Sequence, residues 1–306
     1  SLAFFALLYF LMKRFPGQDL FQIFETVSGK IIGRMLTLTF SFYFLYYAAI
    51  NIREFSAILK AYSFPYTPVS MIILPLMLIV TAMAYVGLEG IVRVAYIFAF
   101  PILGGLLLIL LLAIPVYNWE YLQPIFGYGI RTTITTGVLR ASAYNEIIIL
   151  AIIINSIHGL KNFKRVGVTA LVIAGVSISI CTACILAAFQ YTTGGEHLSG
   201  MFQLSRVIYY SRFIQRIEAV FLFIWVFASV ITVSTAFYIS IKAYCRAFLI
   251  KNHRPLLLPF LFVTGAVTFF PHNLSEILQI HVQLTREYSS LLIYTVPTLI
   301  LALAVV

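Results

Sequence analysis

The stretch Arg140-Ala-Ser-Ala-Tyr-Asn-Glu146 interrupts an otherwise apolar segment, Thr132–Ile157, near its middle. The whole segment is long enough to cross a bilayer, which takes about 20 residues of helix. A charged side chain at that depth costs about 3 kcal/mol on insertion scales, so both charges are expected to face a cavity or a partner. Small and polar residues at this place predict a membrane-spanning helix that unwinds halfway through the lipid.

The composition of the chain is that of a membrane protein. Hydrophobic residues make up 62% of the 306 residues, charged residues only 10%, and the mean hydropathy is +1.01. Soluble domains carry about 25% charged residues. A net charge of +10 would suggest nucleic acid as partner of a soluble protein, but here it fits basic loops at one face of a bilayer. We therefore expect an all-α polytopic protein in a lipid bilayer, with no nucleic-acid partner.

Eight segments after Ser1–Met12 approach or exceed the length that a bilayer requires. Helices are expected because lipid offers backbone polar groups no partner outside their own segment. A shorter segment, Gly17–Gly29, repeats apolar residues at helical spacing and predicts an amphipathic helix on the membrane surface. The eight spans are Ile31–Leu59, Pro68–Tyr85, Gly90–Val116, Thr132–Ile157, Val166–Phe189, Glu218–Tyr244, Pro255–Phe270 and Ser289–Val306.

Basic residues in the loops indicate the orientation of these spans. With the connection after Met12 cytoplasmic and the sides alternating, twelve basic residues lie inside and seven outside, and Arg140 stays within the membrane. This bias predicts a cytoplasmic C-terminus. The cytoplasmic set is Lys13, Arg14, Lys30, Arg34, Arg93, Lys161, Lys164, Arg165, Lys242, Arg246, Lys251 and Arg254. The outer set is Arg53, Lys60, Arg131, Arg206, Arg212, Arg216 and Arg286.

The first apolar segment, Ser1–Met12, is short for a span: as a helix it measures about 18 Å against about 30 Å of hydrocarbon. We expect it to be the end of a truncated spanning helix. One further helix before it would give ten spans, the count of two five-helix inverted repeats in secondary transporters. The prediction is a single transmembrane domain over residues 1–306, a ten-helix bundle with its first helix missing and its second truncated.

Candidate ligand-binding residues cluster in the interrupted segment: Arg140, Ser142, Tyr144, Asn145 and Glu146. A break there would expose the N-terminus of a half-helix, which attracts anionic groups, and Ser142 or Asn145 would cap it. The alternative is that Arg140 and Glu146 only pair with each other inside the bundle.

Two other predicted spans add four candidates. Tyr47 and Asn51 lie on one helix face, one turn apart, and are expected to line a pocket. Trp225 and Ser229 also share a face, and helix packing explains them as well as ligand contact does.

Catalytic and cofactor-binding patterns are scarce. No nucleotide-binding glycine loop or paired-histidine metal motif occurs, so we expect no enzyme, no cofactor and no metal. Cys181 and Cys184 have a CxxC spacing but lie in an apolar run, where small packing residues are the simpler interpretation. The five histidines lie near predicted helix ends, as interfacial polar residues do.

Several stretches, taken in order, resemble one known family. They are Lys13-Arg-Phe-Pro-Gly-Gln18, Arg53-Glu-Phe55, Pro65-Tyr-Thr-Pro68, Gly87-Leu-Glu-Gly-Ile-Val-Arg93, Arg216-Ile-Glu-Ala-Val-Phe-Leu-Phe-Ile-Trp225 and His253-Arg-Pro-Leu-Leu-Leu-Pro259. The ordered set resembles the endospore germination permease family, the B-type subunits of nutrient germinant receptors, along essentially the whole chain from Tyr9.

The resemblance implies the ten-helix inverted-repeat fold of amino-acid permeases of the amino acid–polyamine–organocation superfamily. It also implies a location in the spore inner membrane and a role in sensing a small nutrient, an amino acid or a sugar. Implied partners are an A-type membrane subunit and a C-type lipoprotein. By analogy with related permeases, ligand would lie among four helices, three of which are Ile31–Leu59, Thr132–Ile157 and Glu218–Tyr244. An active amino-acid transporter, proton-coupled through Glu146, is the alternative.

Overall fold

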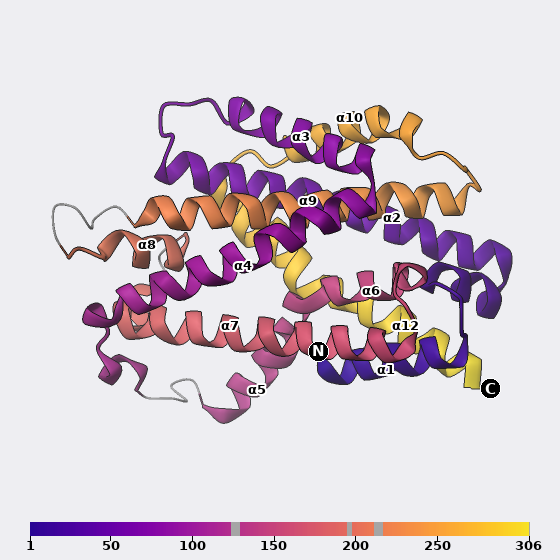
Figure 1. The fold of residues 1–306 in the computed structure, drawn as a ribbon, viewed down its shortest axis with the longest axis horizontal. Helices are drawn as coiled ribbons and strands as arrows, with labels where there is room; N and C mark the ends of the chain where they lie inside the picture. The colour runs from indigo at the N-terminus through magenta and orange to yellow at the C-terminus, as the bar shows by residue number, and fades with distance from the viewer. Residues whose placement is uncertain (124–128, 195–197, 211–216, 306) are drawn as a thin grey trace. The chain divides into compact units, whose positions relative to one another are not determined.

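The computed structural model describes residues 1–123, 129–194, 198–210 and 217–305, which form helices joined by short connections (Figure 1). Within these ranges there is no β-strand. The α-helices are α1 (Leu2–Arg14), α2 (Leu20–Tyr62), α3 (Val69–Val86), α4 (Leu88–Leu112), α5 (Ile130–Leu139), α6 (Ile148–Ile152), α7 (Leu160–Gly194), α8 (Gly200–Val207), α9 (Glu218–Ala247), α10 (Leu257–Thr268), α11 (Leu274–Glu276) and α12 (Ser289–Val305). Short 3₁₀ helices are η1 (Ile114–Val116), η2 (Trp119–Leu122), η3 (Arg140–Ile147), η4 (Ile154–Ser156) and η5 (Arg254–Leu256), and π-helices are η6 (Ile277–Val282) and η7 (Leu284–Tyr288).

Within the described ranges, five helices are long and apolar enough to cross a membrane, namely α2, α3, α4, α7 and α9. Two shorter apolar helices, Arg254–Thr268 and Ser289–Ala304, match the last two predicted spans. The expectation of an all-α polytopic membrane protein is therefore confirmed. Arg212 and Arg216 of the predicted outer connection lie outside the described residues.

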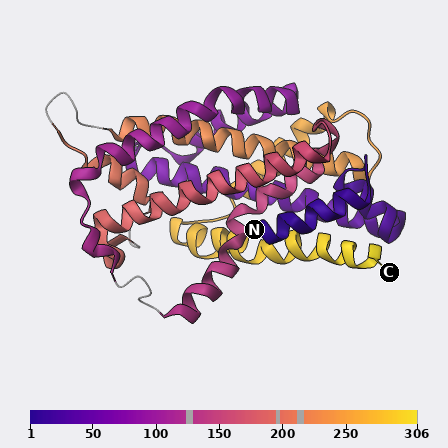
Figure 2. The same ribbon diagram turned by 60° about the horizontal axis from the view of Figure 1, so that its bottom comes forward.

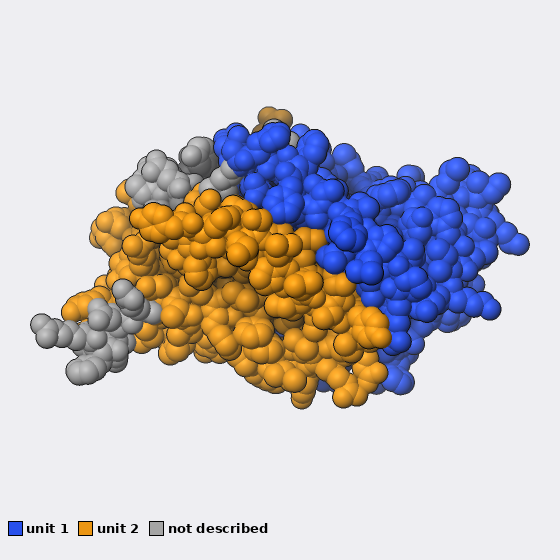
Figure 3. Space-filling view, turned by 90° about the horizontal axis from the view of Figure 1, so that it is seen from above, with its two compact units in different colours: residues 1–54, 134–174, 236–306 blue, residues 55–133, 175–235 orange. Residues whose placement is uncertain are grey.

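The chain divides into two compact units, coloured separately in Figure 3. Unit 1 comprises residues 1–54, 134–174 and 236–306, and unit 2 comprises residues 55–133 and 175–235. The boundaries fall inside helices α2, α5, α7 and α9, so each of these helices contributes to both units.

Unit 2 has its buried core near the end of α4. The core is formed by Ile109, Leu110, Ala113, Cys184, Phe202, Leu204, Ile208, Phe221 and Ile224. Tyr62 stacks on Phe202 with ring centroids 4.3 Å apart, which attaches α8 to the end of α2. Cys184 is buried in this core as a free thiol, and the half-buried Cys181 packs against it. Both therefore act as packing residues here, as the sequence indicated.

In unit 1, α1 packs against α12, α6 and the beginning of α7 (Figures 1 and 2). Phe4 meets Tyr294 of α12 at 4.2 Å between ring centroids, and Phe5 stacks on Phe163 at 5.3 Å. Gly167 is required at this contact, because a Cβ there would lie 2.0 Å from the Phe5 ring. Buried aromatic rings thus hold α1 in the unit.

The predicted amphipathic helix forms, but its apolar side packs against protein. The helix begins at Leu20 and is separated from the rest of α2 by Gly29, whose φ of 80° lies in the left-handed region that favours glycine. Leu20, Phe21 and Phe24 are buried, and both phenylalanines contact Phe40. The apolar repeat therefore buries its face inside unit 1 instead of in lipid.

Candidate functional site

The interruption predicted in the segment Thr132–Ile157 is present. The α-helix α5 ends at Leu139, the 3₁₀ helix η3 follows with non-helical angles at Tyr144 (φ −109°, ψ 22°), and α6 resumes at Ile148. Changes of helix type in the middle of a span frequently mark functional hinges or strain. This confirms the break in the helix on which the sequence-based site depends.

The predicted half-helix cap is not formed. Ile147, the residue before α6, has right-handed helical angles and makes no side-chain capping bond. The 3₁₀ helix η3 therefore continues directly into α6, so no open helix end precedes α6. Asn145 uses its amide elsewhere, and the side chain of Ser142 lies outside the described residues. The anion site expected at this helix terminus stays a prediction.

The carboxylate of Glu146 is fixed from the neighbouring helix. The Tyr47 hydroxyl of α2 donates a hydrogen bond of 2.5 Å to Oε1 of Glu146. Glu146 is exposed and Tyr47 half-buried, so the pair lies at the edge of the unit 1 interior. A hydrogen bond to a charged acceptor is stronger than a neutral one. The bond holds the carboxylate in one direction while the rest of the group stays open to a ligand.

Asn145 points the other way, into the interior. It is 4% exposed, and its Nδ2 donates a short hydrogen bond to the Ser289 hydroxyl at the start of α12. Within the described part of the chain, its Oδ1 is buried without a hydrogen-bond partner. Ser289 in turn donates to the carbonyl of Thr285. A buried acceptor without a partner is costly, so this oxygen is available to a water molecule or a ligand donor.

A polar stripe on η6, η7 and α12 faces this region. His281, Thr285 and Ser289 are each four residues apart, and their exposed fractions are 7%, 6% and 7%. The wide turn of a π-helix keeps residues with this spacing close to one face. The Tyr43 hydroxyl of α2 lies within hydrogen-bonding reach of Ser289 and Asn145. The stripe therefore joins α2 and η3 into one polar core in unit 1.

His281 extends the polar core toward the connection between α10 and α12. Its Nδ1 lies 2.6 Å from the Tyr46 hydroxyl, and its Nε2 lies 3.7 Å from Oε1 of Glu276. Hydrogen bonding from the backbone N–H of His272 to Oε2 is the largest cause that lowers the pKa of Glu276 below 4.5. The interfacial interpretation of this histidine is wrong, because the π-helix turns its ring inward.

The remaining predicted residues of unit 1 are less engaged. Asn51 is half-buried, and its side-chain amide donates a hydrogen bond of 2.7 Å to the Tyr47 carbonyl of its own helix. This bond does not make Asn51 part of a pocket wall. Tyr144 is half-buried and Arg140 exposed. Tyr47, Asn145 and Glu146 are thus the predicted residues that the tertiary structure connects through side chains.

Trp225 and Ser229 belong to α9 in unit 2. Trp225 packs between aromatic rings, with Phe55 at 4.7 Å and Phe221 at 5.8 Å between centroids. Ser229 is half-buried. The contacts of Trp225 are those of helix packing, and the role of both residues in ligand binding stays a prediction.

Sequence reasoning overlooked Tyr43, His281, Thr285 and Ser289 as parts of the core. Their signal was a polar residue at every fourth position, 281, 285 and 289, in the segment before the last span. A stripe at helical spacing predicts one common face. The partner face on α2 has the same spacing at Tyr43 and Tyr47. The sequence does not show that these two stripes meet, because that depends on how the helices pack.

The polar core offers a definite chemistry. It presents the carboxylates of Glu146 and Glu276, the phenol groups of three tyrosines, a buried amide oxygen and an imidazole that has partners on both nitrogens. Such a set can accept hydrogen bonds from an ammonium or hydroxyl group. Within the described residues, no group of three His, Cys, Asp or Glu is placed to hold a metal ion.

The fold and this core define a multi-pass α-helical membrane protein with a polar site among its helices. A family model described as spore germination protein matches residues 1–277. The chain belongs to this family of germination-related membrane proteins, as its ordered sequence stretches indicated. The matched region contains Tyr47, Glu146 and Glu276 but ends before His281.

Two curated proteins of Bacillus subtilis (strain 168) are similar to the chain. Spore germination protein KB is 23% identical over 274 residues, which cover 83% of this chain and 74% of that protein. YfkT, also named as a spore germination protein, is 22% identical over 238 residues, which cover 77% of this chain and 64% of that protein. No solved structure matches the chain.

Proposed function

We propose that this chain is the membrane subunit of a nutrient germinant receptor in the spore inner membrane. It binds a small nutrient, an amino acid or a sugar, in the polar core of unit 1 and passes the change to its companions. The companions are an A-type membrane subunit and a C-type lipoprotein. Membership in the spore germination protein family supports the role in germination.

The observation that carries the binding site is the hydrogen bond between Tyr47 and Glu146 beside the interrupted helix. An exposed carboxylate with a fixed direction suits an ammonium or hydroxyl group of a nutrient. The buried Oδ1 of Asn145, on the interior side, is a further acceptor. Arg140, Ser142, Tyr144 and Asn51 complete the proposed site, and Trp225 and Ser229 of unit 2 remain separate ligand-binding candidates. No cofactor or metal takes part.

The architecture in this proposal is a single permease domain over residues 1–306 with the ten-helix inverted-repeat plan and a cytoplasmic C-terminus. The interrupted segment supports the plan, because transporters of this kind bind substrate at broken helices. The excess of basic residues at one end of the spans supports the orientation.

Glu146→Gln tests the site directly. Germination triggered by a panel of amino acids and sugars is measured in spores that carry the full receptor, with protein level determined by immunoblot. We expect the nutrient concentration for half-maximal response to rise at least about 10-fold, because a neutral amide replaces the charged acceptor and the charge-assisted part of the hydrogen bond to the nutrient is lost. Glu89→Gln is the matched control, since Glu89 lies on exposed α4 and pairs with Arg93 at 2.5 Å. An unchanged response at normal protein level removes Glu146 from the site.

The second candidate function is an active amino-acid transporter that is proton-coupled through Glu146. It is favoured by an exposed carboxylate bonded to a tyrosine in an interrupted span. Uptake of labelled amino acid into proteoliposomes that contain the isolated full-length subunit separates the two. Concentrative uptake would favour the transporter. Deletion of the companion subunits abolishes the response of a sensor but spares transport.

A further inference from the structure

Two open cavities adjoin each other at the end of unit 1 where α9 terminates. One has a volume of about 490 Å³ and is lined by Gln18, Glu25, Lys30 and Arg246, among others. The other has a volume of about 420 Å³ and is lined by Lys242, Arg246 and Lys251, among others. Arg246 lines both, and the second cavity, which Lys242 and Lys251 line, is called the basic cavity below.

The arginines of this region are balanced by carboxylates. Glu25 lies 3.7 Å from Arg34 and 3.4 Å from Arg246, and Arg246 also attracts the half-buried Asp19. Among the described residues that line either cavity, Glu25 is the one carboxylate. The positive charges of Arg34 and Arg246 are therefore balanced by the negative charges of Glu25 and Asp19. The lysines that line the cavities are an excess of positive charge.

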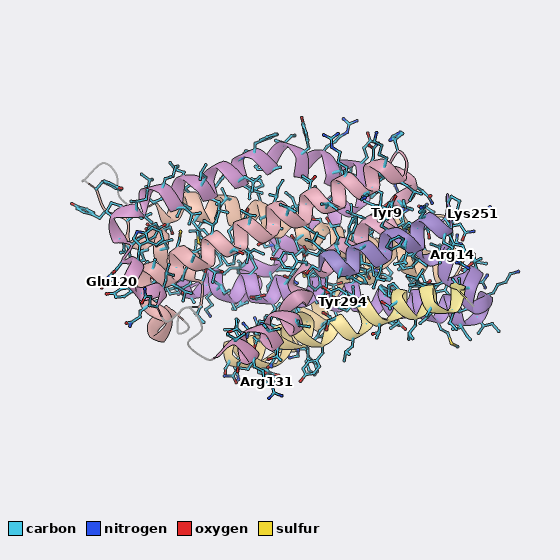
Figure 4. The ribbon with its side chains drawn as sticks, turned by 90° about the horizontal axis from the view of Figure 1, so that it is seen from below. Tyr9, Arg14, Glu120, Arg131, Lys251 and Tyr294 are labelled. Carbon is cyan, nitrogen blue, oxygen red and sulfur yellow. The ribbon has the colours of Figure 1, made fainter. Side chains whose placement is uncertain are left out.

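In the basic cavity this excess consists of Lys242 and Lys251, with Arg254 close by in sequence. Figure 4 labels Lys251 at the same end of unit 1 as Arg14 and Tyr9. Two ammonium groups that line one cavity create a positive potential that selects an anion. Phosphate oxygens match these donors in number and charge.

An apolar surface borders the basic cavity. Phe248, Leu249 and Ile250 follow α9 directly and are 54%, 60% and 38% exposed. Leu249 and Ile250 line the cavity itself. Apolar side chains beside cations at the end of a membrane-spanning helix match an amphiphile, with a charged head and hydrocarbon chains.

Leu249 is held in this exposed position by a strained turn. Its φ of 58° lies in the left-handed region, and the N–H of Ile250 donates to the Cys245 carbonyl at 2.8 Å to close the helix end. Glycine is the usual residue at this place because a side chain disfavours the conformation. A leucine here accepts strain and exposes an apolar group, which is explained if something apolar covers it.

We propose that the basic cavity binds an anionic phospholipid, with the phosphate on Lys242 and Lys251 and the acyl chains along Phe248–Ile250. A free phosphate and a phospholipid both carry an anionic phosphate group. The apolar border favours the phospholipid, because only the phospholipid has acyl chains. The site is separate from the polar core of the proposed function and does not depend on it. Binding at this site attaches the end of α9 to anionic lipids of the surrounding bilayer.

The test measures the apparent unfolding temperature of the full-length protein in neutral detergent during titration with lipid. Binding to the folded state raises this temperature. Dioleoylphosphatidylglycerol is expected to stabilise the protein saturably, and dioleoylphosphatidylcholine to have little effect. In Lys242→Gln/Lys251→Gln the affinity for dioleoylphosphatidylglycerol should fall about 30-fold, since each lysine near the surface contributes about fivefold. Lys13→Gln/Lys161→Gln removes the same charge from exposed positions of unit 1 outside the cavity and should keep the wild-type affinity.

A second variant, Leu249→Gly, tests the proposal even if Lys242→Gln/Lys251→Gln fails to fold. It relieves the strained turn and removes the apolar contact, so the lipid-free protein should become more stable while the lipid binds more weakly. Equal stabilisation by inorganic phosphate and by the lipid would overturn the proposal in favour of a free anion. Equal weakening in the Lys13/Lys161 control would overturn it in favour of diffuse charge. Loss of a companion protein in Lys242→Gln/Lys251→Gln, with lipid affinity unchanged, would overturn it in favour of a protein interface.

Discussion

The Tyr46 hydroxyl oxygen lies 2.6 Å from Nδ1 of His281, although 235 residues separate the two in the sequence. The bond joins α2 to the π-helical segment before α12, and Nε2 of His281 lies 3.7 Å from Glu276. Both ring nitrogens of a buried histidine are thus engaged. This contact fixes one edge of the polar core that contains the proposed nutrient site.

Tyr46→Phe should destabilise the protein by about 1–3 kcal/mol, because a buried nitrogen of His281 loses its partner and cannot reach water. The measurement is thermal or denaturant unfolding of the purified protein in detergent. Tyr66→Phe is the matched control, since Tyr66 is 99% exposed and its hydroxyl remains hydrated. Equal stability of the two variants would mean that the Tyr46–His281 contact contributes nothing.

Ser289→Ala should cost about 1–3 kcal/mol of folding free energy. The Nδ2 of Asn145 is buried and would lose the hydroxyl that it contacts, while its Oδ1 already lacks a partner in the described part of the chain. Thr298→Ala provides the control, because this hydroxyl lies on the exposed side of α12 and bonds to the Tyr294 carbonyl. A loss as large in the control would point to α12 itself and not to the polar core.

The stability of the protein should depend on acid pH through Glu276. The hydrogen bond from the His272 backbone N–H lowers the pKa of Glu276 below its ordinary value of 4.5. A lowered carboxyl pKa stabilises the folded state above pH 4.5 and loses this effect as the pH falls through the lowered value. The difference in unfolding temperature between wild type and Glu276→Gln should therefore shrink as the pH falls below 4.5. A difference that grows toward acid pH would contradict the assignment.

Asp19 begins α2 with a reciprocal cap: Oδ1 of Asp19 accepts from the Gln22 N–H at 2.9 Å, and Oε1 of Gln22 accepts from the Asp19 N–H at 2.8 Å. Burial raises the pKa of Asp19 above 3.8. The folded state is therefore weakened as the pH rises through the raised pKa, because the buried carboxyl must then be charged. Asp19→Asn keeps the cap and removes this charge, so it should raise the unfolding temperature at neutral pH.

Asp19→Ala separates the cap from the charge. It removes both and should destabilise the helix by about 1 kcal/mol relative to Asp19→Asn, which is the usual contribution of an N-terminal cap. Unfolding of both variants is followed across the acid range. If Asp19→Asn is the less stable of the two, the capping geometry has no energetic role.

Much of the site was predictable because local composition carries the signal. The small and polar residues of Arg140–Glu146 predicted the interruption between α5 and α6, and the one-turn spacing of Tyr47 and Asn51 predicted their common face. The side-chain cap before α6 was not formed, since local composition does not say whether a broken helix opens or tightens into a 3₁₀ turn. The choice depends on what packs around it, here Ser289 and Tyr47.

The sequence by itself determined that this is an all-α protein of the membrane and where its apolar helices lie, because hydropathy and the need to satisfy backbone groups in lipid act on each segment separately. It also determined the family, through stretches that keep their order along the chain. The tertiary structure alone decided that Glu146 bonds to Tyr47, that Asn145 turns toward Ser289, and that His281 points inward. Those contacts join segments far apart in sequence, and their partners are selected by helix packing, which no local pattern encodes.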